Sequence, residues 1–239
     1  VFQSVKKSNI IDFTTKLGLS PELSGNYLHE AHAIGGYNGE SPLTVAAAYA
    51  AIGNKGVYNE TYSYTKIVYR DTGEEYVKEH GSERAMSEAT AYILTDMLIS
   101  TAPSALLHYS NVNGWKFAAK TGTSNFTEET KKANGLADNA INDLWVAAYN
   151  DEYTISVWYG YDKIYQDAYT RFGDTSHMEL FNKVAHSVWT RPIKTDKPDD
   201  VVEVTIEAGA VTPKLPSQYT PDYLRTVELF RKGSEPTEV

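Results

Sequence analysis

Hydrophobic residues recur at helical spacing near the start of the chain and again after its first glycine-rich stretch. Apolar positions such as Val5, Ile10 and Phe13 predict a helix within 1–18, and Gly18 provides a C-terminal stop. Three glycines between 35 and 39 then interrupt the pattern. Ser41-Pro42 joins a capping hydroxyl to a proline that suits a first turn, which predicts a helix over 42–52.

Two further helices are predicted later in the chain. Ser87 is a capping residue in front of an apolar helical pattern that we expect to end before Pro103, because proline breaks a helix interior. A last helix is predicted over 176–189. Its face is expected to consist of Leu180, Val184 and Val188 and to pack on a sheet.

Alternating and β-branched residues predict the strands. A peripheral hairpin is expected over 62–78, with its turn at Asp71-Thr72-Gly73. Three longer strands follow: Trp115 to Lys120, Leu144 to Tyr149 and Tyr153 to Tyr159. Only Asn150-Asp151-Glu152 separates the last two, which predicts antiparallel neighbours. The pattern therefore indicates helices that pack on a sheet with antiparallel strands.

The composition changes after Arg191-Pro192, which divides the chain. Residues 194–200 are charged and broken by proline, as in a linker or a surface crossing, and the tail beyond them has one alternating run, Val201 to Ile206. We expect one main domain over 1–196 and a C-terminal extension over 197–239.

Charge and composition exclude several kinds of protein. The 31 acidic residues outnumber the 22 lysines and arginines, and the net charge of -9 argues against a nucleic-acid partner. The absence of cysteine excludes disulfides, cysteine-based zinc sites and thiol nucleophiles. The chain has no run of eighteen apolar residues, which is the length that would predict a membrane span. We expect no metal and no cofactor.

Lys120-Thr121-Gly122-Thr123 is the strongest chemical signal, and the strand prediction places it at a strand end. A cation and two hydroxyls attract and orient a carboxylate, and glycine leaves room for a ligand along the strand. Lys-Thr-Gly alone is common by chance, so its context has to decide.

The context resembles the class A penicillin-binding proteins, over nearly the whole chain up to about Pro192. Five ordered segments carry the resemblance: Gly35-Gly36 with Gly39-Glu40-Ser41-Pro42-Leu43, Ala48-Tyr49-Ala50 with Asn54-Lys55-Gly56, Met86-Ser87, Ala118 to Thr123, and Asp143-Leu144-Trp145. The resemblance implies the C-terminal part of a transpeptidase domain with the α/β fold of penicillin-binding transpeptidases and serine β-lactamases. We therefore expect a central, mainly antiparallel sheet with helices on both faces.

That family cross-links peptidoglycan stem peptides through a serine acyl-enzyme, which β-lactams trap. By the resemblance, Lys120 supplies positive charge, Thr121 and Thr123 bind the substrate carboxylate, and Gly122 lets the substrate approach. The Thr123 N–H is one of two oxyanion donors. The resemblance also implies that the protein is located at the extracytoplasmic face of the bacterial membrane.

Two literal matches to the other catalytic motifs are rejected. Ser4-Val5-Lys6-Lys7 fits Ser-x-x-Lys, but Ser4 lies in the first predicted helix and lacks the usual flanking glycine and proline. Ser24-Gly25-Asn26 fits Ser-x-Asn and is rejected as well. We expect the true motifs to precede Val1, on an N-terminal part of the same protein that stays bound to this chain. The chain by itself is then catalytically incomplete.

Two other local patterns carry no catalytic chemistry, and rival functions stay open. His29 and His32 are spaced i, i+3, whereas the zinc-protease helix needs i, i+4, so they are interpreted as solvated loop residues. Asp71-Thr72-Gly73 is interpreted as a turn. The rival functions are a D,D-carboxypeptidase or β-lactamase of the same fold, and a non-catalytic module that recognises cell-wall peptide.

Overall fold

The computed structural model describes residues 2–23, 27–37, 39–209 and 211–239. Its α-helices are α1 Lys7–Lys16, α2 Pro42–Gly53, α3 Glu88–Leu106, α4 Glu128–Asn134 and α5 Ser176–Val188. Short 3-10 turns occur at η1 Phe2–Ser4, η2 Glu30–Ile34, η3 Leu107–Ser110 and η4 Asp222–Leu224. The strands are β1 Val57–Asn59, β2 Lys66–Val68, β3 Glu75–Val77, β4 Ser82–Arg84, β5 Ala118–Asn125, β6 Ala140–Tyr149, β7 Thr154–Gly160, β8 Thr170–Arg171, β9 Val201–Glu207 and β10 Arg225–Arg231.

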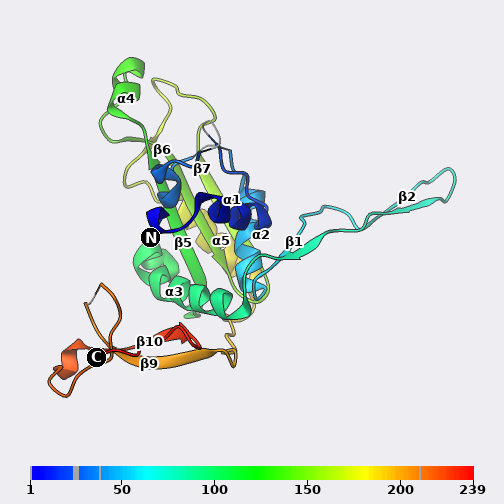
Figure 1. Ribbon diagram of the computed structural model, residues 1–239. Coiled ribbons are helices and arrows are strands. Elements are labelled where there is room, and N and C mark those ends of the chain that lie inside the picture. The colour runs from blue at the N-terminus through cyan, green and yellow to red at the C-terminus, as the bar shows by residue number, and fades with distance from the viewer. Residues whose placement is uncertain (1, 24–26, 38, 210) are drawn as a thin grey trace.

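A central antiparallel sheet organises the molecule, and its strands follow the order β5-β6-β7, with β8 paired to one end of β6. Helix α2 and helix α5 pack on opposite faces of the sheet, and α3 runs beside β5 (Figure 1). The predicted α/β fold, an antiparallel sheet with helices on both faces, is therefore confirmed.

Alternation along the strands separates the interior into two cores, because successive side chains of a strand point to opposite faces. Ala118 belongs to the core beneath α2, together with Tyr149, Ala51 and Leu98. Its neighbour Ala119 belongs to the other core, which α5 covers and which contains Phe117, Phe181, Trp189 and Val146. Helix α3 contributes to both cores through different turns.

The predicted start of α2 is confirmed, but the predicted end of α3 is wrong. Ser41 caps α2 by accepting a hydrogen bond from the Thr44 N–H at 3.2 Å. Helix α3 begins after its cap Ser87 and continues through Pro103 to Leu106. Ala102 and Leu106 are 3% and 0% exposed, so burying this last turn outweighs the hydrogen bond that proline removes.

The predicted packing face of α5 is only partly right, although the helix itself is confirmed. Val184 is half-buried and packs against the core, as predicted, whereas Val188 is exposed. The buried residues are His177, Phe181 and Ala185, whereas Leu180 is half exposed. Phe181 and Ala185 each follow a predicted residue, Leu180 and Val184, by one position, so the buried face is rotated by one residue about the helix axis. The Phe181 and Phe117 rings pack with their centres 5.6 Å apart and their planes tilted by 50°, and burying this aromatic residue sets the rotation of the helix.

Several small elements lie outside the central body. The predicted hairpin is confirmed as β2 paired with β3, and it projects away from the body (Figure 1). Sequence patterns did not reveal α4, the β1–β4 pair that connects this hairpin to the body, or β10, which pairs with β9 in the tail. Each of these segments is short or largely polar, so it lacks a hydrophobic period.

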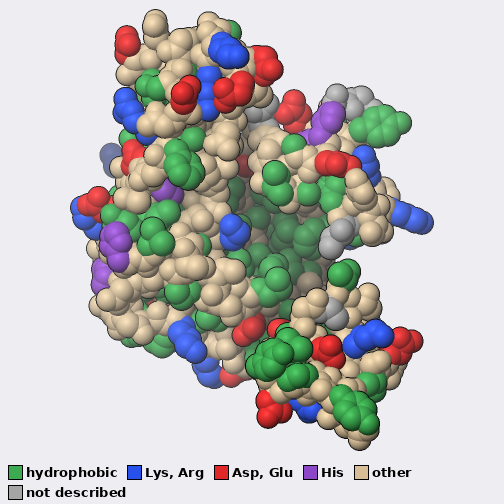
Figure 2. All heavy atoms as spheres, turned by 90° about the vertical axis from the view of Figure 1, so that its left-hand side faces the viewer, with side chains coloured by type: hydrophobic (Ala, Val, Ile, Leu, Met, Phe, Trp, Pro, Cys, Tyr) green, Lys and Arg blue, Asp and Glu red, His purple; other side chains and the backbone are tan. Residues whose placement is uncertain are grey.

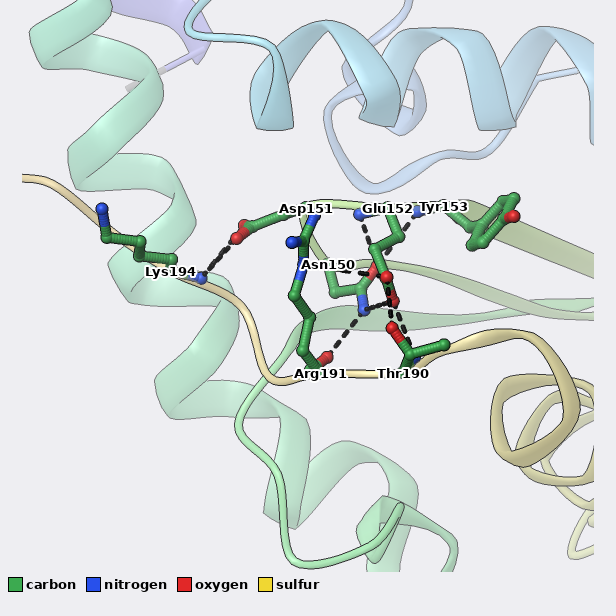
Figure 3. Close-up of polar contacts among 7 residues, drawn as sticks. All are labelled: Asn150, Asp151, Glu152, Tyr153, Thr190, Arg191 and Lys194. Carbon is green, nitrogen blue, oxygen red and sulfur yellow. Dashed lines mark hydrogen bonds and ion pairs between the residues drawn. The ribbon is translucent and has the colours of Figure 1, made fainter.

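The turn between β6 and β7 fastens the segment that leads to the tail (Figure 3). Asn150 is 6% exposed, and its side-chain amide N–H donates to the Arg191 backbone carbonyl at 2.9 Å. The side-chain carbonyl oxygen of Asn150 accepts from the backbone N–H groups of Glu152 and Tyr153. Glu152 accepts from the Thr190 N–H at 2.7 Å, and Asp151 accepts from the Lys194 N–H at 3.0 Å. We call these residues the turn clasp. The start of the predicted linker is thus held against the sheet.

Candidate functional site

Strand β5 carries Lys120, Thr121, Gly122 and Thr123 in its middle, not at its end. The strand begins at Ala118 and continues to Asn125, so the predicted strand end at Lys120 is wrong. The later residues are polar and gave no hydrophobic signal, yet their backbone pairs with β6 until a bulge between Ser124 and Asn125. β6 is paired along one edge of β5, and in the described residues no strand pairs with the other edge.

The register of the sheet places a row of functional side chains on the face that α2 covers. Gly122 lies opposite Trp145, and Trp145 lies opposite Trp158 on β7. In the next row, Ser124 lies opposite Asp143, which lies opposite Gly160. Lys120 shares the face of Gly122 because side chains two apart on a strand point the same way.

A cavity of about 640 Å³ lies over this row. Its floor comes from β5, β6 and β7, and its walls come from the η2 to α2 segment and from the residues that follow β7. All four residues from Lys120 to Thr123 line it, since β5 is the outer strand of the described sheet. The structure therefore brings the predicted site residues together in one cavity. The face seen in Figure 2 is hollowed, with hydrophobic side chains on the floor of the hollow.

Lys120 is exposed, and its ammonium group donates to the Thr121 carbonyl oxygen at 2.8 Å. Thr123 is also exposed, and Gly122 is partly buried. A Cβ added at Gly122 would lie 3.3 Å from the Trp145 Cβ, a closer approach than side chains normally make. Glycine at this position therefore lets β5 lie close to the tryptophan row.

Asp143 holds this part of the sheet together, a role that sequence reasoning missed. Its carboxylate accepts from the Ser124 hydroxyl at 2.7 Å, from the Trp158 indole N–H at 2.6 Å and from the Asn142 amide. A Cβ at Gly160 would lie 2.8 Å from the Trp158 ring and 3.0 Å from the carboxylate. The indole therefore reaches Asp143 across the space that Gly160 leaves open. The Asp143-Leu144-Trp145 pattern was the available signal for Asp143 in the sequence. It could not reveal Ser124 and Trp158 as partners, because they come from other strands.

Glu40 fixes the opposite wall of the cavity. It accepts from the Ser20 N–H and from the Thr44 hydroxyl, both at 2.7 Å, and so joins the α1 exit to the start of α2. Tyr37 and Tyr49 lie on the same wall. Burial raises the pKa of Tyr49, and burial together with the Glu40 carboxylate raises the pKa of Tyr37, so both phenols remain neutral hydrogen-bonding groups.

The structure separates the rejected motifs from the cavity or leaves them untested. Ser4 lies in η1, exposed, and does not belong to the described residues that line the cavity. Ser24-Gly25-Asn26 lies outside the described residues. Within the described ranges, no serine hydroxyl is hydrogen-bonded to a lysine amine, the pairing that Ser-x-x-Lys would supply.

The histidines and the Asp-Thr-Gly triplet also lie apart from the cavity. The rings of His29 and His32 stack at 5.8 Å, and His32 accepts from the His29 N–H. In the part of the chain that the structure describes, no group of three metal-binding side chains lies together. Asp71-Thr72-Gly73 forms the β2–β3 turn, with Gly73 at a φ of +71°, as expected for turn chemistry. Of the helices described, none has both the length and the hydropathy to cross a membrane.

Two family models match the chain. The penicillin binding protein transpeptidase domain matches residues 2–186, and the penicillin-binding protein 1A C-terminal domain matches residues 197–239. The first match contains the central sheet and the cavity. The second contains the β9–β10 pair.

Relatives and a solved structure agree with these models. Penicillin-binding protein 1A/1B of Bacillus subtilis is 35% identical over 249 residues, which include the whole of this chain and 26% of that protein. Penicillin-binding protein 1A of Clostridium tetani is 31% identical, with 85% of this chain and 25% of that protein covered. The crystal structure of penicillin-binding protein 1A from Haemophilus influenzae has a TM-score of 0.65 at 17% identity, covering 97% of this chain and 39% of that one. The chain thus spans about a quarter of the length of these curated relatives.

Proposed function

This chain belongs to the penicillin-binding protein transpeptidase family, and we propose that it is the C-terminal part of a peptidoglycan D,D-transpeptidase domain. In this proposal the nucleophilic serine, with its Ser-x-x-Lys and Ser-x-Asn motifs, lies on an N-terminal part of the same protein, and the cavity lies between the two parts. The chain would act on the extracytoplasmic face of the bacterial membrane. Residues 1–196 would complete the catalytic domain, and 197–239 would be a separate extension.

One observation carries the proposal: the cation and hydroxyls of Lys120 to Thr123 line a large cavity from a strand whose outer edge is unpaired in the described sheet. An extended peptide can add to such an edge as a further strand, with main-chain hydrogen bonds holding it. A stem peptide that ends in D-Ala-D-Ala has the required shape and a terminal carboxylate. We assign Lys120 to attract that carboxylate, and Thr121 and Thr123 to bind it with their hydroxyls.

The chemical step follows from these assignments. The serine oxygen forms a bond to the carbonyl carbon of the penultimate D-alanine, the peptide bond breaks, and the terminal D-alanine leaves with a proton on its nitrogen. The Thr123 N–H would stabilise the oxyanion that forms on the way. An amine of a second stem peptide then takes the acyl group, and the serine regains its proton. Gly122 leaves room for the substrate beside β5.

The test is the reaction of the full-length protein with a penicillin, followed by intact-mass and peptide mass analysis. We expect one covalent adduct, on a serine upstream of Val1. In the Lys120→Ala variant, the second-order acylation rate constant should fall about 10- to 100-fold, since a charge-assisted hydrogen bond is worth about 1.5–3 kcal/mol. Lys116→Ala is the matched control, because Lys116 is also an exposed lysine but does not line the cavity.

The outcomes separate the rival functions. An adduct on Ser4 would reverse the rejection of that motif, and no adduct on any residue would favour a non-catalytic cell-wall module. Equal rates for Lys120→Ala and Lys116→Ala would refute the assigned role of Lys120. If the acyl-enzyme formed from a peptide that ends in D-Ala-D-Ala passes its acyl group to water and not to an added amine, the protein is a carboxypeptidase. Rapid hydrolysis of the penicillin adduct would identify a β-lactamase.

A further inference from the structure

The cavity has a cluster of aromatic side chains that the proposed role of β5 does not use, with two tryptophans on its floor and Tyr161 beside them. Trp145 and Trp158 lie side by side on β6 and β7, with their ring centres 6.5 Å apart, and both line the cavity. Tyr161, which is 41% exposed, lines it from the segment that directly follows β7. Electron-rich ring faces of this kind attract organic cations, and tryptophan attracts them most strongly.

Directly after Tyr161 comes a carboxylate that has no partner among the described residues. Asp162 lines the same cavity and is exposed. Across the described residues, it forms no hydrogen bond and no ion pair. The other two carboxylates of the cavity differ from it, because Asp143 accepts three hydrogen bonds and Glu40 accepts two. Asp162 is therefore the one described carboxylate of the cavity that remains available for a ligand.

The charge balance of the cavity also favours a cation at this end. Its described lining contains three carboxylates, Glu40, Asp143 and Asp162, and a single cation, Lys120. Lys120 is on β5, at one end of the strand order β5-β6-β7, whereas Asp162 comes two residues after β7, the strand at the other end, so the two opposite charges come from opposite ends of this order. A ligand with a carboxylate at one end and an ammonium group elsewhere would match this separation.

We propose that Asp162, together with Trp145, Trp158 and Tyr161, forms a subsite for a primary alkylammonium side chain of the peptide substrate. The alkyl chain would lie against the indole and phenol faces, and the ammonium group would donate hydrogen bonds to the Asp162 carboxylate. We call this the cation subsite. It rests on the proposed transpeptidase function, because only a peptide lying along β5 would bring such a side chain here.

The ammonium group could belong to the peptide that acylates the serine or to the peptide that accepts the acyl group, and kinetic measurements distinguish the two sources. The full-length protein is compared with its Asp162→Asn and Asp167→Asn variants. Asp167 is the matched control, because it is an exposed aspartate of the same loop that does not line the cavity. The donors are a lysine-containing peptide that ends in D-Ala-D-Ala and the same peptide acetylated on the lysine side chain.

If the donor occupies the cation subsite, the unmodified donor should acylate the protein about 10-fold faster than the acetylated one, and Asp162→Asn should abolish this preference. If the acceptor occupies it, both donors should react alike, and Asp162→Asn should raise the KM for a lysine-containing acceptor about 10-fold. In both cases acylation by penicillin should be unchanged. The inference is overturned if Asp162→Asn and Asp167→Asn agree within twofold in every assay, or if acylation by penicillin falls to the same extent as peptide turnover.

A binding measurement without turnover separates this inference from the proposed function. A lysine-containing peptide that lacks the D-Ala-D-Ala end is titrated into the full-length protein while tryptophan fluorescence is recorded. We expect the Kd to rise about 5- to 10-fold in Asp162→Asn and to stay unchanged in Asp167→Asn. If this difference appears in a protein that no penicillin acylates, the cation subsite stands and the catalytic proposal fails. If acylation occurs and the difference is absent, the cation subsite alone fails.

Discussion

The substitution Gly160→Ala tests whether the space above Gly160 is needed for the Trp158–Asp143 hydrogen bond. An added Cβ would lie 2.8 and 2.9 Å from two atoms of the indole ring and 3.0 Å from the carboxylate oxygen. Contacts this short force the indole to move. Gly160 has no positive φ that would forbid alanine, so the effect is steric and does not arise from backbone strain.

The magnitude follows from the bond that is lost. A hydrogen bond to a charged group contributes about 1.5–3 kcal/mol. Replacing glycine by alanine raises the free energy of unfolding by about 0.4–1 kcal/mol, because alanine restricts the conformations of the unfolded chain. We therefore expect the free energy of unfolding to fall by about 1–2 kcal/mol. For a chain of this length, Tm should fall by about 2–8 °C.

The assay is thermal unfolding followed by tryptophan fluorescence, with Gly81→Ala as the control. A Cβ at Gly81 would approach Glu60 no closer than 3.6 Å, an ordinary contact, so this variant should be as stable as the parent or slightly more stable. The emission spectrum of native Gly160→Ala should also shift, because the Trp158 indole leaves Asp143. Equal Tm values and spectra for Gly160→Ala and the parent would refute the steric argument.

Two further predictions concern the turn clasp. Asn150→Ala should lower the free energy of unfolding by about 2–3 kcal/mol, because three hydrogen bonds of 2.9–3.0 Å are lost and their partners lose a buried acceptor or donor. The measurement is urea unfolding, and a change below about 0.5 kcal/mol would contradict this prediction. Hydrogen bonds from Thr190, followed by the charge of Arg191, hold the pKa of Glu152 below its ordinary value of 4.5. A carboxylate whose pKa is lowered by folding stabilises the fold at pH values above its pKa in the unfolded chain. This stabilisation is lost as the pH falls through the pKa of the folded state. The Tm difference between the parent and Glu152→Gln should therefore be largest near pH 7 and shrink below about pH 4.5, and a difference that stays constant from pH 7 to pH 3 would be inconsistent with this linkage.

Local chemistry was enough to predict much of the fold. Ser41-Pro42 and Ser87 each combine a capping hydroxyl with an apolar period, and both helices begin where predicted. The short turn at 150–152 fixed the antiparallel pairing of β6 and β7. These signals involve neighbours in sequence, so their physics is complete without knowledge of the rest of the chain.

Where elements ended and which face they buried depended on contacts distant in sequence. Helix α3 continues past Pro103 because its last turn packs into the core, and α5 is rotated so that Phe181 meets Phe117. Strand β5 extends through polar residues because β6 supplies backbone partners. In each case a tertiary gain outweighed the local preference from which the prediction was made.

The candidate site divides in the same way. The sequence by itself determined the residue types of Lys120 to Thr123 and the chemistry that they can offer to a carboxylate. The tertiary structure decided that Asp143 joins Ser124 to Trp158 and that Asp162 stands beside two tryptophans in the same cavity. Neither arrangement has a local signature, because the register of three strands, set by backbone hydrogen bonds along their whole length, brings these side chains to one face.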